Sequence, residues 1–185
     1  MSDQADVLVE RRGAVATIVL QHSRRRNAMT VAMWDRLGEV AHALDSDDDV
    51  SVIILLGAGS EAFSAGADIS EFESYRSTPE KALAYSYRVH HALESLVTSS
   101  KPTIAMVHGF CIGGGCEIAI ATDMRIAAEG ATFGVPAAKL GISIAMEDIK
   151  RLVDLVGPSN ASEILYTGRR FSAQRALHKI GRAHV

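Results

Sequence analysis

The residues best suited to chemistry lie in one glycine-rich segment, Gly113-Gly114-Gly115-Cys116-Glu117. The segment follows an apolar run that is predicted to be a buried strand, and it opens a predicted helix. The N–H groups of a helix's first turn have no partner inside the helix, and the helix dipole adds partial positive charge there. Because three glycines leave no Cβ atom in the approach path, this turn suits an anionic oxygen or a phosphate.

Glu117 is the candidate acid or base of this segment. It lies three residues after Gly114, and in a helix this spacing puts both residues on one face. Its neighbours Cys116 and Ile118 are apolar, so burial is expected to raise the pKa of Glu117 toward the range of a general base. The alternative is a structural carboxylate paired with a nearby arginine such as Arg125, and the spacing alone leaves both interpretations open.

A second loop of small residues spans 62–69 and also follows a predicted buried strand. Small residues let a ligand approach the backbone closely, and successive free N–H groups can bind developing negative charge. Asp68 and Ser70 can cap the helix that follows. Ser64 has a glycine on one side only, so the loop is not the nucleophile elbow of a serine hydrolase. Taken alone, the loop is typical of an ordinary strand-to-helix turn.

Other chemical motifs are excluded or weak. The chain has no G-x-G-x-x-G dinucleotide motif and no P-loop ending. His90, His91 and His108 have no cysteine or carboxylate at metal-ligand spacing, so no metal site is predicted. Cys111 and Cys116 form neither a zinc pattern nor a disulfide framework, and we interpret them as small buried hydrophobic residues in a reducing compartment.

An α/β fold with mainly parallel strands is predicted to position the two loops, because strand-like and helix-like segments alternate. The strands are expected at 14–20, 50–56, 103–107 and 124–128, and the second and third read as fully buried. The helices are expected at 31–45 with Thr30 as N-cap, at 79–97, from Gly113 to about 122, and at 146–156, 159–167 and 173–178. In the 79–97 helix, one apolar face is expected to include Leu83, Tyr87, His90 or His91, Leu93 and Val97.

Bulk composition indicates one soluble globular domain, with 48% hydrophobic and 22% charged residues in 185. A net charge of −3 does not favour binding to nucleic acid or to an anionic membrane. With neither a secretory signal nor an apolar run of about 18 residues, a cytoplasmic location is expected.

The last seven residues, 179–185 (KIGRAHV), resemble the translation of a widely used sequencing adapter. We therefore interpret 1–178 as a single core domain and 179–185 as a non-native tail. A longer genomic reading frame that retains these seven residues would refute this interpretation.

Several segments together resemble the enoyl-CoA hydratase/isomerase (crotonase) family in residue type and order. They are SRRRNAMT at 23–30, FSAGADI at 63–69, GGGCE at 113–117, DMRIA at 123–127, FGVP at 133–136 and LG at 140–141. The resemblance covers roughly residues 6–178. It implies a crotonase-like spiral of repeated β-β-α units with an incomplete C-terminal helical region, and a homotrimer or hexamer for a full-length chain.

The resemblance also implies a site. Glu117 would be the catalytic acid or base, and the thioester carbonyl would lie in an oxyanion hole made by the N–H groups of Ala67 and Gly114. The residues implied to contact the CoA moiety or the substrate are Arg24, Arg26, Ala65, Gly66, Asp68, Ile69 and Gly113. Coenzyme A would enter as part of an acyl-CoA substrate, and no separate cofactor, metal, nucleic acid or membrane partner is expected.

One departure from the family affects the predicted reaction. Hydratases of the family usually carry a second glutamate directly after the proline of the 133–136 segment, where this chain has Ala137. Hydration of 2-enoyl-CoA through a thioester enolate remains the predicted function, and Glu147 or Asp148 are candidates for the missing acid. The alternatives are a double-bond isomerase that uses a single glutamate, an acyl-CoA binding protein with little catalysis, and the disfavoured possibility of a serine peptidase of related fold.

Overall fold

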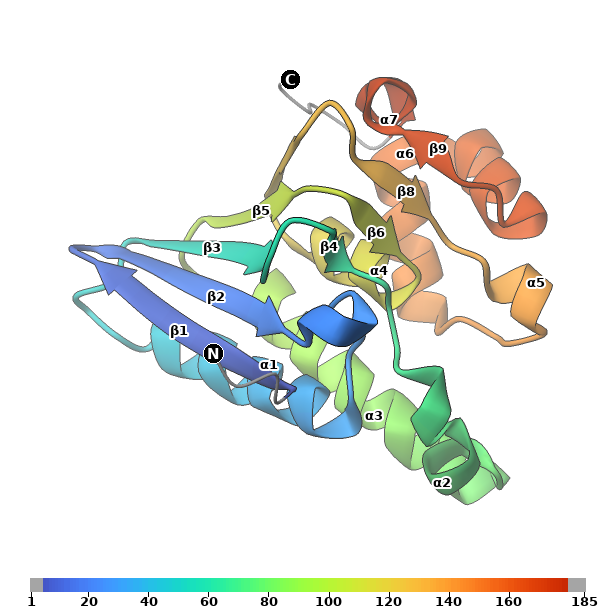
Figure 1. Ribbon diagram of the computed structural model, residues 1–185, viewed down its shortest axis with the longest axis horizontal. Helices are drawn as coiled ribbons and strands as arrows, with labels where there is room; N and C mark the ends of the chain where they lie inside the picture. The colour runs from blue at the N-terminus through green and yellow to red at the C-terminus, as the bar shows by residue number, and fades with distance from the viewer. Residues whose placement is uncertain (1–4, 180–185) are drawn as a thin grey trace.

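The computed structural model describes residues 5–179 (Figure 1). Its strands are β1 (Asp6–Arg12), β2 (Val15–Gln21), β3 (Val52–Gly57), β4 (Ala62–Ser64), β5 (Thr103–Val107), β6 (Phe110–Ile112), β7 (Met124–Ala127), β8 (Thr132–Gly134) and β9 (Phe171–Ser172). Its helices are α1 (Val31–Asp45), α2 (Phe72–Arg76), α3 (Pro79–Val97), α4 (Gly114–Ala121), α5 (Ala137–Leu140), α6 (Met146–Thr167) and α7 (Ala173–Lys179), with short 3₁₀ turns at Ser23–Arg25 and Ile69–Glu71.

The chain repeats a β-β-α unit, and the successive repeats add strands to two separate sheets. The first sheet has the order β1-β2-β3-β5-β7 and the second has the order β4-β6-β8-β9. The successive units β3-β4, β5-β6 and β7-β8 each add one strand to each sheet before the chain enters a helix. All pairings are parallel except the β1–β2 hairpin and β8–β9. The predicted spiral of repeated units is confirmed.

The predicted helices agree closely with the observed ones. α1 begins after Thr30, whose hydroxyl accepts a hydrogen bond from the Met33 N–H, and α3 begins at Pro79. α6 runs over both predicted segments as one element that is broken at Gly157, where φ is +76°. The predicted tail 179–185 lies outside the described residues, apart from its first residue at the end of α7.

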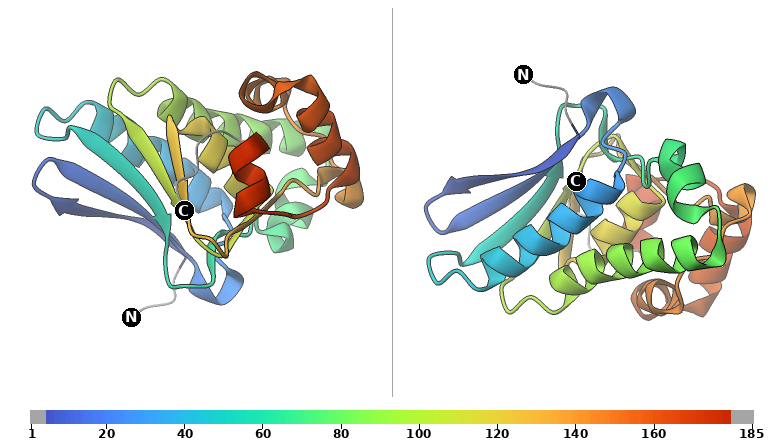
Figure 2. Two further views of the ribbon diagram at one scale, coloured as in Figure 1. Left: turned by 90° about the horizontal axis from the view of Figure 1, so that it is seen from above. Right: turned by 90° about the horizontal axis from the view of Figure 1, so that it is seen from below.

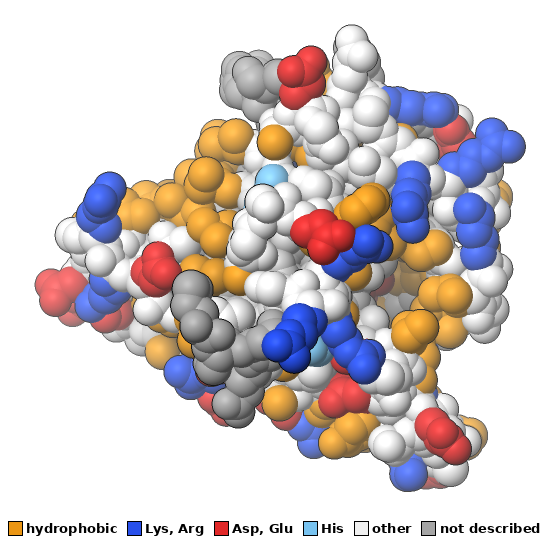
Figure 3. Space-filling model, viewed as in Figure 1, with side chains coloured by type: hydrophobic (Ala, Val, Ile, Leu, Met, Phe, Trp, Pro, Cys, Tyr) orange, Lys and Arg blue, Asp and Glu red, His pale blue; other side chains and the backbone are white. Residues whose placement is uncertain are grey.

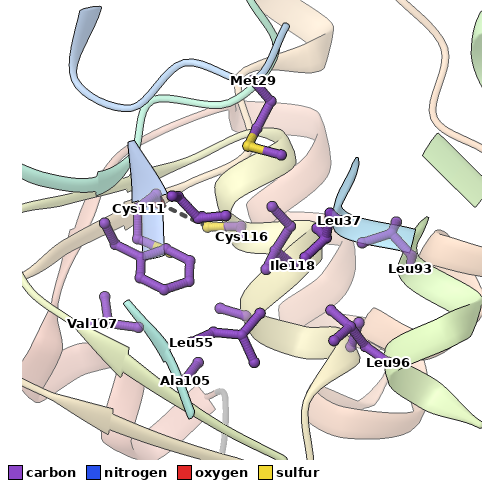
Figure 4. Close-up of a cluster of buried hydrophobic side chains, with 14 of the residues drawn as sticks. Met29, Leu37, Leu55, Leu93, Leu96, Ala105, Val107, Cys111, Cys116 and Ile118 are labelled. Atoms are coloured by element: carbon purple, nitrogen blue, oxygen red, sulfur yellow. Dashed lines mark hydrogen bonds between the residues drawn. The ribbon is translucent and has the colours of Figure 1, made fainter. Parts of the chain in front are cut away.

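One face of the larger sheet is covered by α1 and α3, which lie side by side (Figure 2). Between sheet and helices lies the core shown in Figure 4, where the Cys116 thiol donates to the Cys111 carbonyl. Both cysteines are buried free thiols, as predicted.

The prediction that residues 50–56 and 103–107 are buried on both faces is wrong. Burial alternates along β3 and β5, and Met106 is 43% exposed. Met124 and Ile126 of β7 are exposed beside it, and Figure 3 shows hydrophobic side chains gathered over this region of the sheet. An apolar run predicts a strand, but it does not reveal whether a layer covers the second face.

The predicted apolar face of α3 is wrong except at Leu93, which is buried. Leu83, Tyr87 and Val97 are exposed. The buried residues of this helix are Tyr85, Ala92, Leu93 and Leu96. Both sets recur at helical spacing, so periodicity could not decide which stripe packs against α1 and α4.

Buried Asn27 ties the turn after β2 to the β3–β4 connection. Its amide nitrogen donates to the carbonyls of Ala58 (2.9 Å) and Ala62 (2.8 Å), and its amide oxygen accepts from the His22 N–H (3.0 Å). Asn27 has a φ of +55°, a conformation that asparagine tolerates better than most residues. The Asn27 side chain therefore holds together the two connections that lead into the 62–69 loop.

We expect Asn27→Ala to lower the free energy of unfolding by about 3 kcal/mol, roughly 1 kcal/mol for each lost hydrogen bond. Asn27→Gly is the matched control, because it removes the same bonds but tolerates the positive φ. Urea unfolding of the three proteins separates the two contributions. A loss below about 1 kcal/mol in both variants would show that this network is dispensable.

Candidate functional site

The two glycine-containing loops, far apart in sequence, lie against each other. A Cβ atom built on Gly66 would lie 3.0 Å from the Gly114 nitrogen, and one built on Gly114 would lie 3.5 Å from the Ala67 nitrogen. The parallel pairing of β4 with β6 causes this proximity, because the carboxyl ends of both strands meet at one edge. The N–H groups of Ala67 and Gly114 are therefore near neighbours.

Neither of these two N–H groups has an acceptor within residues 5–179. Gly114 is the first residue of α4, so its N–H has no partner inside the helix. On the other loop, the Met29 N–H donates to the Gly66 carbonyl and the Asp68 N–H donates to the Met29 carbonyl, which leaves out the Ala67 N–H. Ala67 and Gly114 both line one cavity.

Gly113 and Gly115 of the second loop are required for two different steric reasons. Gly113 has a φ of +53°, which a residue with a Cβ atom adopts only with strain. A Cβ atom on Gly115 would lie 2.5 Å from the Ser64 carbonyl oxygen, so α4 can pack on β4 only with glycine there. This contact brings α4, which begins in one loop, against β4, which precedes the other.

Glu117 lines the cavity beside Gly114, as its spacing predicts. Burial raises its pKa to about 7, the nearby charge of Asp148 acts in the same direction, and the charge of Arg76 opposes them. The alternative of a pair with Arg125 is not observed. The Arg125 guanidinium instead donates to the carbonyls of Thr122 (2.7 Å) and Ala119 (3.3 Å) near the end of α4.

The raised pKa of Glu117 has a consequence for stability. Its carboxyl group binds a proton more tightly in the folded chain than in the unfolded chain, whose pKa is near 4.5. Stability from this group is therefore fully present below that pH and is lost as pH rises to about 7. We expect Glu117→Gln to be more stable than wild type at pH 8, by at most about 3 kcal/mol, with a smaller gap at pH 5.

Urea unfolding at the two pH values measures this gap. Glu147→Gln is the matched control, because Glu147 is exposed on the first turn of α6 and should change stability little at either pH. An equal gap for Glu117→Gln at pH 5 and pH 8 would contradict the raised pKa.

Aromatic residues and one arginine form a wall of the cavity that the sequence did not indicate. Trp34, Phe72, Arg76 and Tyr85 all line it. The Arg76 guanidinium lies over the rings of Phe72 (4.7 Å) and Tyr85 (5.3 Å), and burial raises the pKa of Tyr85 to about 12. The helical spacing of Tyr85 with Ala92 and Leu96 could have indicated that Tyr85 faces the interior. The exposed residues of α3 recur at the same spacing, so the sequence did not distinguish the two faces of the helix.

The residues implied to contact CoA divide into two groups. Ala65, Gly66, Ile69 and Gly113 line the cavity. Asp68, Arg24 and Arg26 are not among its lining residues. Burial alone would raise the pKa of Asp68, but the hydrogen bonds from Ser70 and the charge of Arg25 outweigh it and lower that pKa.

The two arginines implied to contact the CoA moiety, Arg24 and Arg26, lie on the surface. Arg26 is exposed; its guanidinium pairs with Glu61 at 2.8 Å and lies over the Phe110 ring at 5.0 Å. Arg24 is exposed in the 3₁₀ turn that precedes Arg26.

The position of the missing glutamate, Ala137, also lines the cavity. Of the two candidate substitutes, Glu147 is exposed and absent from the cavity wall, whereas Asp148 is buried and lines it. Within residues 5–179, no cluster of three or more potential metal ligands occurs. No helix in the same part of the chain is long and apolar enough to cross a membrane.

Two sheets built from repeated β-β-α units, with the N–H groups of two loops side by side near the half-buried Glu117, are typical of a crotonase-fold protein. The family profile described as Enoyl-CoA hydratase/isomerase matches residues 10–181. The chain belongs to the enoyl-CoA hydratase/isomerase family.

Curated relatives and solved structures agree with this assignment. The chain is 36% identical to a short-chain-enoyl-CoA hydratase of Clostridium acetobutylicum and 33% identical to a crotonyl-CoA hydratase of Syntrophomonas wolfei. Each match covers 93% of this chain and 65% of the relative. A crystal structure of an enoyl-CoA hydratase/carnithine racemase from Magnetospirillum magneticum superposes with a TM-score of 0.92 at 37% identity, covering 94% of this chain and 65% of that one. The chain thus spans about 65% of the length of these relatives.

Proposed function

We propose that this protein hydrates 2-enoyl-CoA thioesters through an oxyanion-stabilised enolate. The observation that carries the proposal is the pair of unpartnered N–H groups, Ala67 and Gly114, beside Glu117 in one cavity. The names of the hydratase relatives support the same reaction class.

The geometry suits the chemistry of a thioester. Attack at C3 of a 2-enoyl thioester moves negative charge onto the carbonyl oxygen, and two fixed N–H donors stabilise that charge without reorganisation. One such donor typically contributes about 2.7–4 kcal/mol to the transition state. Glu117, with a pKa raised to about 7, can transfer a proton at C2 or activate water near neutral pH.

The CoA portion is proposed to run along Ala65, Gly66, Ile69 and Gly113, the four predicted contact residues that line the cavity. Arg24 or Arg26 on the adjoining surface is proposed to meet its phosphates. For the full-length protein we propose a homotrimer or hexamer, in keeping with the family. A cytoplasmic location fits its free buried cysteines.

A second candidate is isomerisation of 3-enoyl-CoA, which needs only one carboxyl group and is favoured by Ala137. A peptidase is disfavoured, since Ser64 is fully buried and its hydroxyl donates to the Asn27 carbonyl at 2.7 Å.

Incubation with crotonyl-CoA and with 3-hexenoyl-CoA, followed by chromatography of the products, tests the proposal. Formation of 3-hydroxybutyryl-CoA supports hydration. Conversion of 3-hexenoyl-CoA alone would replace it with the isomerase assignment. Thermal stabilisation by CoA esters without any product would replace it with a binding function.

A further inference from the structure

Asp148 is a buried carboxyl group in the same cavity as Glu117. It lies in the first turn of α6, it is 6% exposed, and it lines the cavity near the helix that contains Ala137. The cavity therefore contains two carboxyl groups, although the position expected to supply the second one is an alanine.

The Asp148 side chain is held in a defined orientation. Its Oδ1 accepts a hydrogen bond from Arg151 Nη1 at 2.6 Å, and the other end of the same guanidinium donates to Glu94 of α3. The second Asp148 oxygen accepts no hydrogen bond from any residue between 5 and 179. One oxygen is thus anchored by Arg151, and the other has no hydrogen-bond partner among the described residues.

The charges around Asp148 come from four helices. Arg151 and Glu147 lie on α6, His90 and Glu94 on α3, Glu117 on α4 and Arg76 on α2. Burial outweighs the charges of Arg151 and His90 and leaves the pKa of Asp148 raised, and the charge of Glu147 acts in the same direction as burial. Among these groups, Arg151 contacts Asp148 directly, and its guanidinium charge favours the ionised form of that carboxyl group. Glu117 has no ion pair with any described residue, so the proton is assigned to Glu117 and the negative charge to Asp148.

We propose that Asp148 is the second carboxyl group of the hydration reaction, taking from α6 the role that Ala137 cannot fill. The ionised Asp148 oxygen accepts a proton from water as the water oxygen forms a bond to C3. The C2–C3 π electrons shift toward C2 and the thioester oxygen, and Glu117 delivers a proton to C2. One water is thereby added across the double bond, and the proton that Asp148 gained returns to Glu117 through solvent.

The separate roles of Glu117 and Asp148 are assigned from their places on the cavity wall. Glu117 lies beside Gly114, where the carbonyl oxygen is proposed to bind, and C2 is one bond from that carbonyl carbon. Asp148 comes from α6, a different part of the cavity wall, and it is therefore assigned to the next carbon along the acyl chain. This inference rests on the proposed hydratase function and specifies which residues carry it out.

Asp148→Asn tests the inference because it keeps the size of the side chain and an oxygen that can accept from Arg151. Hydration of crotonyl-CoA should fall by about 10²-fold, the loss of one proton-transfer group. Exchange of the C2 protons of butyryl-CoA with deuterated water needs only Glu117 and the two amides, so it should stay within a few-fold of wild type. This exchange also verifies that the variant is folded with an intact thioester site.

Glu147→Gln is the matched control, since it removes the neighbouring exposed acid, which does not line the cavity, and should leave both reactions within a few-fold of wild type. In wild type, kcat/KM for hydration should fall on the acidic side as Asp148 becomes protonated, and Asp148→Asn should lose that limb. Wild-type hydration in Asp148→Asn overturns the inference. Loss of exchange in parallel with hydration also overturns it, because Asp148 would then only position Glu117. A wild-type chain that neither hydrates nor exchanges would instead refute the proposed function itself.

Discussion

Replacing Glu117 with glutamine is expected to lower kcat for crotonyl-CoA hydration by about 10³- to 10⁴-fold, at the upper end of what one acid–base group contributes. Glutamine has nearly the same shape but cannot donate and recover a proton near pH 7. In the proposed site the proton on C2 must pass through this residue, since Asp148 is assigned to the water. The α-proton exchange of butyryl-CoA should be lost to a similar degree.

Binding should survive this substitution. The free amides of Ala67 and Gly114 belong to the backbone, and the cavity walls are unchanged, so thermal stabilisation by butyryl-CoA should match that of wild type. Stopped-flow loss of the enoyl absorbance measures the first effect, and a thermal shift titration measures the second. Equal rates in the variant and wild type would remove Glu117 from the mechanism.

The sequence predicted the long elements and both loops because local rules determine them. Thr30 and Pro79 mark helix starts through capping and through a missing N–H group, and both helices begin where expected. The alternation of apolar strand and helix was sufficient for an α/β fold with parallel strands. The resemblance of residues 63–69 and 113–117 to one family supplied the rest, including the spiral.

Tertiary contacts determined the features that were missed. β4, β6 and β8 have three residues each, which is too short for a period-two pattern, and they exist because each one pairs with its neighbour in the second sheet. The packing of α3 on α1 selected the stripe that contains Tyr85 over the one that contains Tyr87. Which short strands form and which helix face is buried depend on the elements packed against them, and a short stretch of sequence carries no information about those elements.

The candidate site likewise has one part that local spacing predicted and one part that depends on tertiary packing. The spacing from Gly114 to Glu117 is local and predicted a shared face, and the cavity contains both. The relation of Glu117 to Asp148 is not local, because it depends on α6 returning to pack against α4. Sequence alone therefore named Glu147 and Asp148 together, and burial separates them, with Asp148 inside and Glu147 in solvent.

Gly66 is the position where fold and site are most tightly coupled. Its φ is +94°, and a Cβ atom there would lie 2.7 Å from the Ile112 carbonyl oxygen and 3.0 Å from the Gly114 nitrogen. A methyl group would thus push the two loops apart and occupy the space beside one of the two free amides.

We expect Gly66→Ala to lower kcat/KM for crotonyl-CoA by about 10²- to 10³-fold, the cost of one lost oxyanion donor. It should also lower the free energy of unfolding by about 2–4 kcal/mol through backbone strain and overpacking. The matched control is Gly59→Ala, which has a φ of +75° but no atom closer to its Cβ than the Ser23 hydroxyl at 3.9 Å. That variant shares the strain and lacks the clash, so it should lose about 1–2 kcal/mol of stability and retain wild-type kcat/KM. If both variants were equally active, the approach of the two loops would matter for folding alone, and the amide pair would have no part in catalysis.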